Sequence, residues 1–532
     1  MHCHLRPSCQ TRGHSYHWLP KGSLANSENR LSGMKVDNSE VVFHLLSGAD
    51  PHSRVFWWKG GLYRAIHGDQ VPFYEHLLSA GIIRNLVRRK LLVDTEATDL
   101  ELDGYGLVLK QQIVPFVSYC YEWCGEMLKA AALLALELET ELLNHGAALW
   151  DLRPHNVLFV GTTPIWIDLG ALGPVSDLER WDSFEMFSAY FTRPLKIMAA
   201  GHSRIARCLL RDGYGGVHQR EVQAITETAS AGVVRAAKTT ATAGAKKIIP
   251  LPLRPYVRRT VQRLARSTTC LEAHRKSSVT GAVREIEKIR LVQASSECLG
   301  GHDDAGFPDF TLTANWTEKR RSILRVLLAK KPGSVLDTGS DRGWYSQLAA
   351  RNGAQVVCAD FDEAAVAKLY SNAVAAKLPI MPLIIDFRNT GPQTAMTNAP
   401  GLAPAERLRC DMVLALAPIY HLAVTAPHWH LVVRALSDFA RKWLVIEFIG
   451  RDDPHMKELS DDPRGIVASS CYSLDTLLAL LNKEFAKIDL LPSENEHRRI
   501  LLCERRQIAE CTPSGPKQTF EQGSPGFVSD SE

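Results

Sequence analysis

The sequence has no long hydrophobic run, and no stretch reaches the roughly 18 apolar residues that a transmembrane helix needs. Residues 1–38 are polar and irregular and lack the apolar core of a signal peptide. Paired C-x-x-C spacing is missing, and the 12 cysteines are scattered as expected for reduced thiols. A net charge of +4 on 532 residues is too small to indicate binding to nucleic acid or membrane. We therefore expect a cytoplasmic protein with no nucleic-acid partner and no transmembrane segment.

The most informative stretch, residues 334–360, reads as a strand, a glycine turn, a helix and a second strand. The first apolar run ends at Asp337, the turn holds Gly339 and Gly343, and the second apolar run ends at Asp360. Glycines let a ligand approach the backbone, and the helix after the turn offers free N–H groups to polar atoms. A carboxylate about 20 residues further on can accept both hydroxyls of a ribose. The spacing departs from the G-x-G-x-x-G of dinucleotide sites, and the acid in the turn repels a pyrophosphate but suits the ammonium of a methionine.

This stretch resembles motif I of class I S-adenosylmethionine-dependent methyltransferases, in the variant V-L-D-x-G-S-x-x-G-W-Y-S. The resemblance implies an α/β fold with a Rossmann-like sheet, helices on both of its faces, and S-adenosyl-L-methionine as the cofactor. An ordinary βαβ unit with a glycine turn is the alternative. The residues expected to bind the cofactor are Asp337, Gly339, Ser340, Gly343, Asp360, Phe361, Asp386 and Phe387.

The flanking segments extend the same fold. An amphipathic helix capped by Thr317 precedes the first strand and ends at Lys330. Later strands are predicted at Pro382–Asp386, Asp411–Leu422 (running into a loop) and Trp443–Phe448, with a closing antiparallel hairpin at Phe485–Leu491 and Arg499–Cys503. In this fold the third strand ends beside the adenine ring, which makes Asp386 with Phe387 the expected adenine wall.

Two residues are candidates for the acceptor side of the site. His421 lies in the loop after the fourth strand, which faces the transferred methyl group in class I methyltransferases, and a histidine there can remove a proton from an acceptor hydroxyl. The alternative is that His421 is a structural histidine that caps the next helix. Glu447 ends the fifth strand, where acids line the crevice of an open α/β sheet, so we expect it to orient the acceptor or assist as a base.

Residues 150–170 carry a second motif, which resembles the catalytic and metal loops of protein kinases and aminoglycoside-type phosphotransferases. Asp151 and Asn156 have the spacing of a catalytic base and a metal ligand, and Asp168 stands where the acid of D-F-G would be. The alternative is a hairpin whose Asp and Asn side chains cap turns.

The kinase-like pattern is incomplete. Leu149 replaces the His of the H-x-D pattern, and no glycine-rich loop precedes it. No strand lysine of the V-A-I-K type stands out, and Lys59 and Lys110 are only candidates. We therefore expect a kinase-like lobe kept for structure or substrate docking, with phosphoryl transfer as the alternative.

At 532 residues the chain is too long for one typical domain. Basic residues from Lys246 to Lys276, Arg275 among them, favour a solvated connector helix, with a lipid- or nucleic-acid-binding helix as the alternative. The predicted division is a disordered N-terminus at 1–38, an α+β kinase-like domain at 39–230, a basic helical connector at 231–305, a methyltransferase domain at 306–506 and a disordered tail at 507–532.

From residue 57 to residue 459 the chain resembles rhizobial nodulation host-specificity proteins of the NoeA type, most clearly over Ala314–Leu348 and Asp411–Pro454. The resemblance implies a methyltransferase acting on a small-molecule or carbohydrate acceptor, with a nodulation signal as one candidate, and without a required metal. A bifunctional or phosphotransferase enzyme and a non-catalytic S-adenosylmethionine-binding scaffold are the alternatives. The acceptor atom and the oligomeric state stay open.

Overall fold

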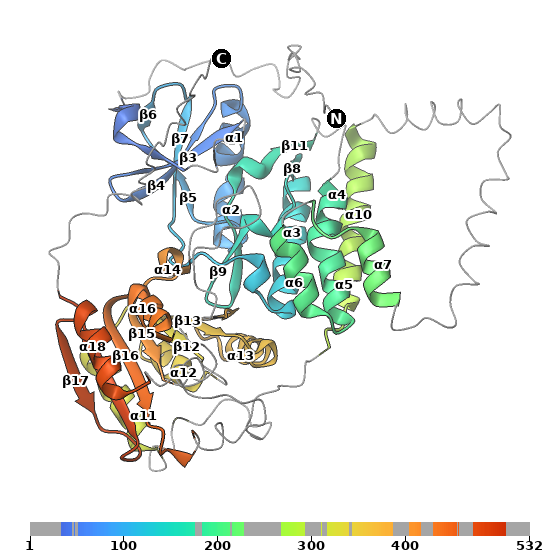
Figure 1. The fold of residues 1–532 in the computed structure, drawn as a ribbon. Helices are drawn as coiled ribbons and strands as arrows, with labels where there is room; N and C mark the ends of the chain where they lie inside the picture. The colour runs from blue at the N-terminus through green and yellow to red at the C-terminus, as the bar shows by residue number, and fades with distance from the viewer. Residues whose placement is uncertain are drawn as a thin grey trace, which may run out of the picture.

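The computed structural model describes residues 33–44, 47, 50, 52–175, 183–212, 215–227, 268–292, 310, 316–339, 343–386, 404–416, 429–454, 456 and 472–506 (Figure 1). The predicted tail at 507–532, most of the predicted disordered N-terminus and much of the connector lie outside these residues.

The N-terminal part begins with a five-stranded antiparallel sheet and a short parallel pair, β1 (Met34–Val36) with β6 (Leu100–Leu102). The five-stranded sheet has the order β2 (Val42–Phe43), β3 (Ser53–Trp58), β4 (Gly61–Ile66), β7 (Leu107–Gln111) and β5 (Thr95–Ala97). Between β4 and β5 lie α1 (Val71–Ser79) and α2 (Ile82–Arg88).

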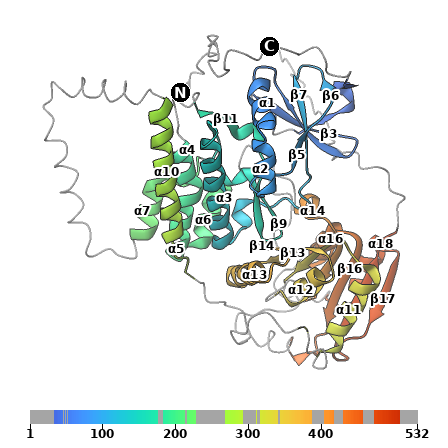
Figure 2. The ribbon, with the colours of Figure 1, turned by 180° about the vertical axis from the view of Figure 1, so that it is seen from behind.

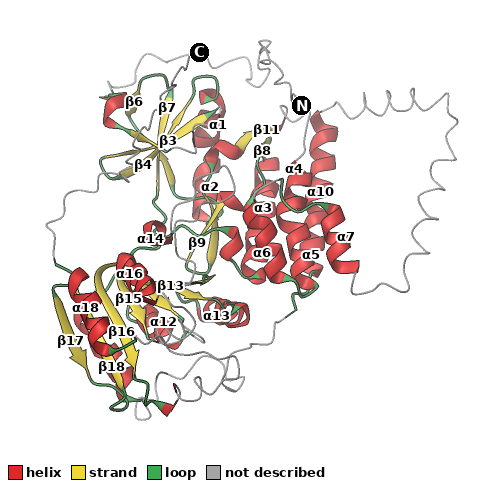
Figure 3. Cartoon of the chain, in the orientation of Figure 1, coloured by secondary structure: helices red, strands yellow, loops and turns green. Residues whose placement is uncertain are grey.

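A mainly helical part follows, centred on α3 (Gly125–Leu143), most of whose residues are buried. Two short antiparallel pairs lie beside it, β8 (Ala147–Leu149) with β11 (Leu172–Pro174) and β9 (Val157–Val160) with β10 (Thr163–Trp166). Around them pack α4 (Ser183–Phe187), α5 (Arg193–Ala199), α6 (Ser203–Asp212) and α7 (Gln219–Glu227) (Figure 3).

Helix α10 (Thr268–Lys288) corrects one expectation, because it packs along α3 and is not a solvated bridge. Its Arg275 is 4% exposed, and the Arg275 Nε lies 2.7 Å from the Glu139 Oε1 of α3. The Arg275 guanidinium also donates to the Leu149 carbonyl, while the Leu149 N–H donates to Glu139. We call residues 33–227 together with α10 the N-terminal lobe; the predicted domain boundaries stay predictions.

The C-terminal part is a seven-stranded sheet in the order β14-β13-β12-β15-β16-β18-β17. The five strands from β14 to β16 are parallel, and β18 runs antiparallel to both of its neighbours, which confirms the predicted closing hairpin. Their bounds are β12 (Ser334–Thr338), β13 (Gln355–Asp360), β14 (Ile380–Ile384), β15 (Cys410–Ala415), β16 (Ala440–Ile449), β17 (Lys487–Leu491) and β18 (Arg498–Glu504). The strand order reverses at β12, and ligands of open α/β sheets bind outside the carboxyl ends of the strands at such a point.

Helices cover both faces of this sheet, as expected for a Rossmann-like α/β fold (Figures 1 and 2). Alternate strand residues face two separate apolar cores. One core is covered by α11 (Glu318–Lys330) and α12 (Trp344–Arg351), the other by α16 (Trp429–Phe439) and α18 (Leu474–Glu484). Helix α13 (Glu363–Ala376) contributes to both cores. Helix α11 begins at its predicted cap, where the Thr317 side chain accepts the Arg320 N–H.

Candidate active site

The carboxyl end of β12 carries Asp337, which is 2% exposed. The Ser346 hydroxyl of α12 donates to the Asp337 Oδ2 at 2.6 Å. Burial raises the pKa of Asp337 to about 7, and the Ser346 bond opposes that rise only in part. None of the described cationic side chains forms an ion pair with this carboxylate. Asp337 is therefore a buried acid that a bound cation would stabilise in its charged form.

The turn after β12 is shaped by two glycines. Gly339 and Gly343 have φ angles of +63° and +69°, in the left-handed region that side chains disfavour. A Cβ on Gly343 would also lie 2.6 Å from the Leu369 Cδ1 of α13. The turn therefore needs glycine at Gly343, where α12 begins. Ser340, between the two glycines, lies outside the described residues.

The next two strands end in the other predicted acids. Asp360 closes β13 with 7% exposure, and its Oδ1 accepts the Asp362 N–H at 3.0 Å. Phe361 follows with 63% of its surface exposed, and Asp386 is half-buried two residues beyond β14. Because β12, β13 and β14 are parallel neighbours, the structure brings Asp337, Asp360 and Asp386 to the same edge of the sheet. Phe387 lies outside the described residues.

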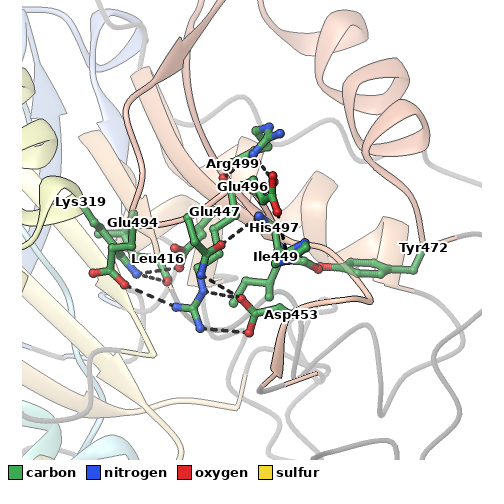
Figure 4. Close-up of polar contacts among 12 residues, drawn as sticks. Lys319, Leu416, Glu447, Ile449, Asp453, Tyr472, Glu494, Glu496, His497 and Arg499 are labelled. Carbon is green, nitrogen blue, oxygen red and sulfur yellow. Dashed lines mark hydrogen bonds and ion pairs between the residues drawn. The ribbon is translucent and has the colours of Figure 1, made fainter. Parts of the chain in front are cut away.

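The acceptor-side candidate Glu447 lies on β16 with 3% exposure and is ion-paired (Figure 4). The Lys319 Nζ of α11 donates to the Glu447 Oε2 at 2.6 Å and to the Leu416 carbonyl at 3.0 Å. The Glu447 Oε1 is buried and has no hydrogen-bond partner among the described residues. Burial raises the pKa of Glu447, and Lys319 opposes that rise. The pair fixes one carboxylate oxygen of Glu447 and leaves the other for a donor.

Sequence reasoning missed Lys319. A signal was available, because Lys319 shares the buried face of α11 with Ile323, Val326 and Leu327, so a lysine occupies the apolar stripe of this helix. His421 lies outside the described residues, so its predicted convergence with Glu447 stays a prediction.

A second polar network flanks Glu447 on the antiparallel side of the sheet (Figure 4). The Arg498 Nε donates to the Asp453 Oδ2 at 2.9 Å, and the same guanidinium lies 3.9 Å from Glu494. The Tyr472 hydroxyl donates to the Ile449 carbonyl at 3.0 Å. These contacts fix the ends of β16 and β18 around the Glu447 side chain.

The kinase-like motif forms the predicted hairpin, β9 with β10, and its polar residues engage the chain itself. The Asn156 amide donates to the Asp151 carbonyl at 3.0 Å, and the Asp151 carboxylate is ion-paired with Arg153. The Asp168 carboxylate accepts the Gly170 N–H and lies 2.7 Å from the Arg64 guanidinium. Both acids of the motif are therefore paired with arginines of this chain.

The strand side chain that reaches Asp168 is an arginine, Arg64 of β4, and neither lysine candidate does so. Lys59 lies over the Trp58 ring, and Lys110 pairs with Glu96. Arg64 is buried, and it also donates to the Ser53 hydroxyl at 2.7 Å and to the Gln111 side chain at 3.3 Å. A pattern that requires a lysine on the strand therefore does not identify Arg64.

The described part of the chain contains neither a membrane-spanning helix nor a cluster of metal-ligating side chains. None of its helices is long and apolar enough to cross a membrane. No group of three or more His, Cys, Asp or Glu side chains in these segments is placed to hold a metal ion.

Comparison with known proteins bears out the resemblance to NoeA-type proteins. No family model matches the chain. It is 27% identical over 430 residues to nodulation protein NoeA of Rhizobium meliloti (strain 1021), covering 77% of this chain and 85% of that protein.

Three solved structures show short partial matches. Magnesium protoporphyrin IX methyltransferase from Synechocystis PCC 6803 with bound S-adenosylmethionine is 18% identical, with 36% of this chain and 79% of that chain covered and a TM-score of 0.26. The bifunctional kinase-methyltransferase WbdD is 19% identical, with 35% and 38% covered and a TM-score of 0.25. TehB from Haemophilus influenzae is 13% identical, with 37% and 64% covered and a TM-score of 0.27.

Proposed function

We propose that this chain is an S-adenosylmethionine-dependent methyltransferase whose cofactor lies across the carboxyl ends of β12, β13 and β14. The observation that carries the proposal is the row of Asp337, Asp360 and Asp386 beside the glycine turn that opens α12, where the strand order reverses. Asp337 fits the cofactor's ammonium, because it is buried, accepts only from Ser346 among the described residues, and the Lys319 ammonium whose charge it feels is ion-paired with Glu447. Asp360 would accept the ribose hydroxyls, with Phe361 and Asp386 on the adenine side and Ser340 and Phe387 completing the site.

In this reaction the main task of the protein is to align the acceptor with the methyl group. The bound sulfonium supplies an already activated methyl group. The chain's own residues must hold an acceptor oxygen, nitrogen or carbon behind the methyl group. Holding the acceptor there raises its effective concentration. Glu447 is suited to this role, since Lys319 holds one of its oxygens and the other, which has no partner among the described residues, can accept from a hydroxyl or amine of the acceptor. His421 is the proposed base.

We infer that the acceptor is a small molecule or a carbohydrate. The similarity to a nodulation protein over 77% of the chain supports a carbohydrate hydroxyl of a nodulation signal or its precursor. This step rests on similarity and not on a site. The test is transfer of labelled methyl groups from S-adenosylmethionine into fractions of a host-cell extract; label in saccharide fractions supports the proposal, and absence of label from every fraction contradicts it.

For the N-terminal lobe we propose a structural or docking role. The supporting observation is that Arg153 and Arg64 engage the Asp151 and Asp168 carboxylates, which a phosphotransferase would need for the acceptor hydroxyl and for Mg²⁺.

A further inference from the structure

Helix α13 is one of the elements of the C-terminal part that contact the N-terminal lobe directly. In both views it lies beside α3 and β9 of the lobe (Figures 1 and 2). At its start, Glu363 forms an ion pair with Arg207 of α6. The two side chains are only 19% and 13% exposed, so the pair is largely shielded from water. The first turn of α13 is therefore tied to the lobe by charge.

The last turns of α13 and the start of β14 are tied to the lobe by a second set of contacts, made by the β9–β10 hairpin. The Tyr370 hydroxyl donates to the Thr162 carbonyl at the hairpin turn at 3.1 Å. The Tyr370 ring meets the Phe159 ring edge-on, with centroids 6.3 Å apart. A Cβ on Gly161 would lie 3.0 Å from the Pro379 Cα just before β14, so the hairpin turn sits tightly against this segment. The kinase-like hairpin thus holds α13 without using its acids.

The same helix shapes two parts of the candidate cofactor site. Glu363 directly follows Asp362, which caps α13 and whose N–H binds the Asp360 carboxylate. Leu369 lies against Gly343, at the point where the glycine turn opens α12. A shift of α13 would therefore move the acid at the tip of β13 and the packing under the glycine turn together.

We propose that the N-terminal lobe completes the cofactor site by fixing α13, with Arg207 acting as a positioning residue through Glu363. The inference rests on the proposed function, since it assumes that S-adenosylmethionine binds at Asp360. It assigns the lobe a role in cofactor affinity that needs no phosphoryl transfer. Glu126 and Cys124 at the start of α3 are the other ionisable groups near this end of the interface.

The test is calorimetric titration of the full chain with S-adenosylhomocysteine. Arg207→Met should weaken binding by about fivefold, in the range of coupling between sites. Arg207→Lys should restore most of the affinity, because it keeps the charge opposite Glu363. Glu363→Gln should weaken binding similarly, and the double variant should be no worse than either single variant, because both changes break one interaction. The matched control is Arg89→Met, which breaks ion pairs with Glu137 and Glu141 inside the lobe and should leave the affinity unchanged.

A second variant covers the case in which Arg207→Met does not fold. Tyr370→Phe removes the bond to Thr162 while the ring keeps its packing. This change should also lower the affinity, whereas the control Arg89→Met should not. If the wild type binds S-adenosylhomocysteine and both Arg207→Met and Tyr370→Phe bind equally well, the positioning role is overturned and the proposed function stands. If the wild type does not bind, the proposed function fails and this inference fails with it.

Discussion

Replacing Lys319 by Met should be among the most damaging single changes in the C-terminal part. The Lys319–Glu447 pair is buried, with side chains 10% and 1% exposed and the charged atoms 2.6 Å apart. At that distance of 2.6 Å the attraction is about 6 kcal/mol with an effective dielectric constant of about 20. Removing one partner of such a pair costs about 3–5 kcal/mol of stability, because the other charge is left buried.

The penalty should depend on pH with a definite sign. Burial raises the pKa of Glu447 and Lys319 opposes the rise, so the pKa should be higher still in Lys319→Met. A carboxyl group with a raised folded pKa stabilises the fold below its unfolded pKa, and this contribution is lost as pH rises through the folded pKa. The variant can protonate Glu447 in acid but must bury an unpaired carboxylate in alkali. The destabilisation should therefore be small near about pH 5 and grow toward about 3–5 kcal/mol in alkali.

The assay is urea denaturation of wild type and Lys319→Met across that pH range. The measured quantity is the difference between their free energies of unfolding. Lys330→Met is the matched control, because Lys330 lies on the same helix and pairs at 3.0 Å with Glu504, both partly exposed. An exposed pair contributes about 0–1 kcal/mol. Equal losses in the two variants, or a loss in Lys319→Met that does not grow with pH, would refute the reasoning.

Four further changes test other parts of the account. Asp360→Ala should cost about 1.5–3 kcal/mol in S-adenosylhomocysteine binding, measured by calorimetry, because charge-assisted bonds to the ribose are lost; unchanged affinity would remove Asp360 from the site. Asp168→Asn should leave methyl transfer within about tenfold of wild type, and an ATPase or phosphotransferase activity that this change abolishes would establish the bifunctional alternative. His421→Ala should lower turnover by about 10²–10⁴-fold with cofactor affinity kept, and Glu447→Gln should lower it less; intact turnover in His421→Ala would make His421 structural.

Local patterns in the sequence predict most of the C-terminal fold. The strands at β12, β13 and β16 are apolar runs bounded by acids or glycines, which is the pattern of strands buried on both faces. The N-terminus of α11 is marked by its cap at Thr317, and the N-terminus of α12 is marked by Gly343. Both signals are local in the sequence. The closing antiparallel hairpin is typical of the family that the sequence resembles, and the pairing of β17 with β18 confirms it.

Pairings between distant residues could not be predicted in the same way. Lys319 and Glu447 are 128 positions apart, and only the fold reveals that the first turn of α11 meets the last residues of β16. Arg275 was expected on a solvated face because its neighbours are basic, yet a buried carboxylate on α3 makes its burial possible. The kinase pattern specifies a lysine and therefore does not identify Arg64, although an arginine can bind a carboxylate in the same place.

The most direct test of the central claim is calorimetric titration of wild type and Asp337→Asn with S-adenosylhomocysteine. The account predicts that wild type binds and that Asp337→Asn binds about tenfold or more weakly, because a neutral amide cannot pair with the ammonium. Burial raises the pKa of Asp337 to about 7, so the wild-type fold loses stability as pH rises through that value. The ligand-free variant should then be at least as stable as wild type above about pH 7, which separates lost binding from lost folding. Failure of wild type to bind, or equal binding by a folded Asp337→Asn protein, would contradict the proposed cofactor site.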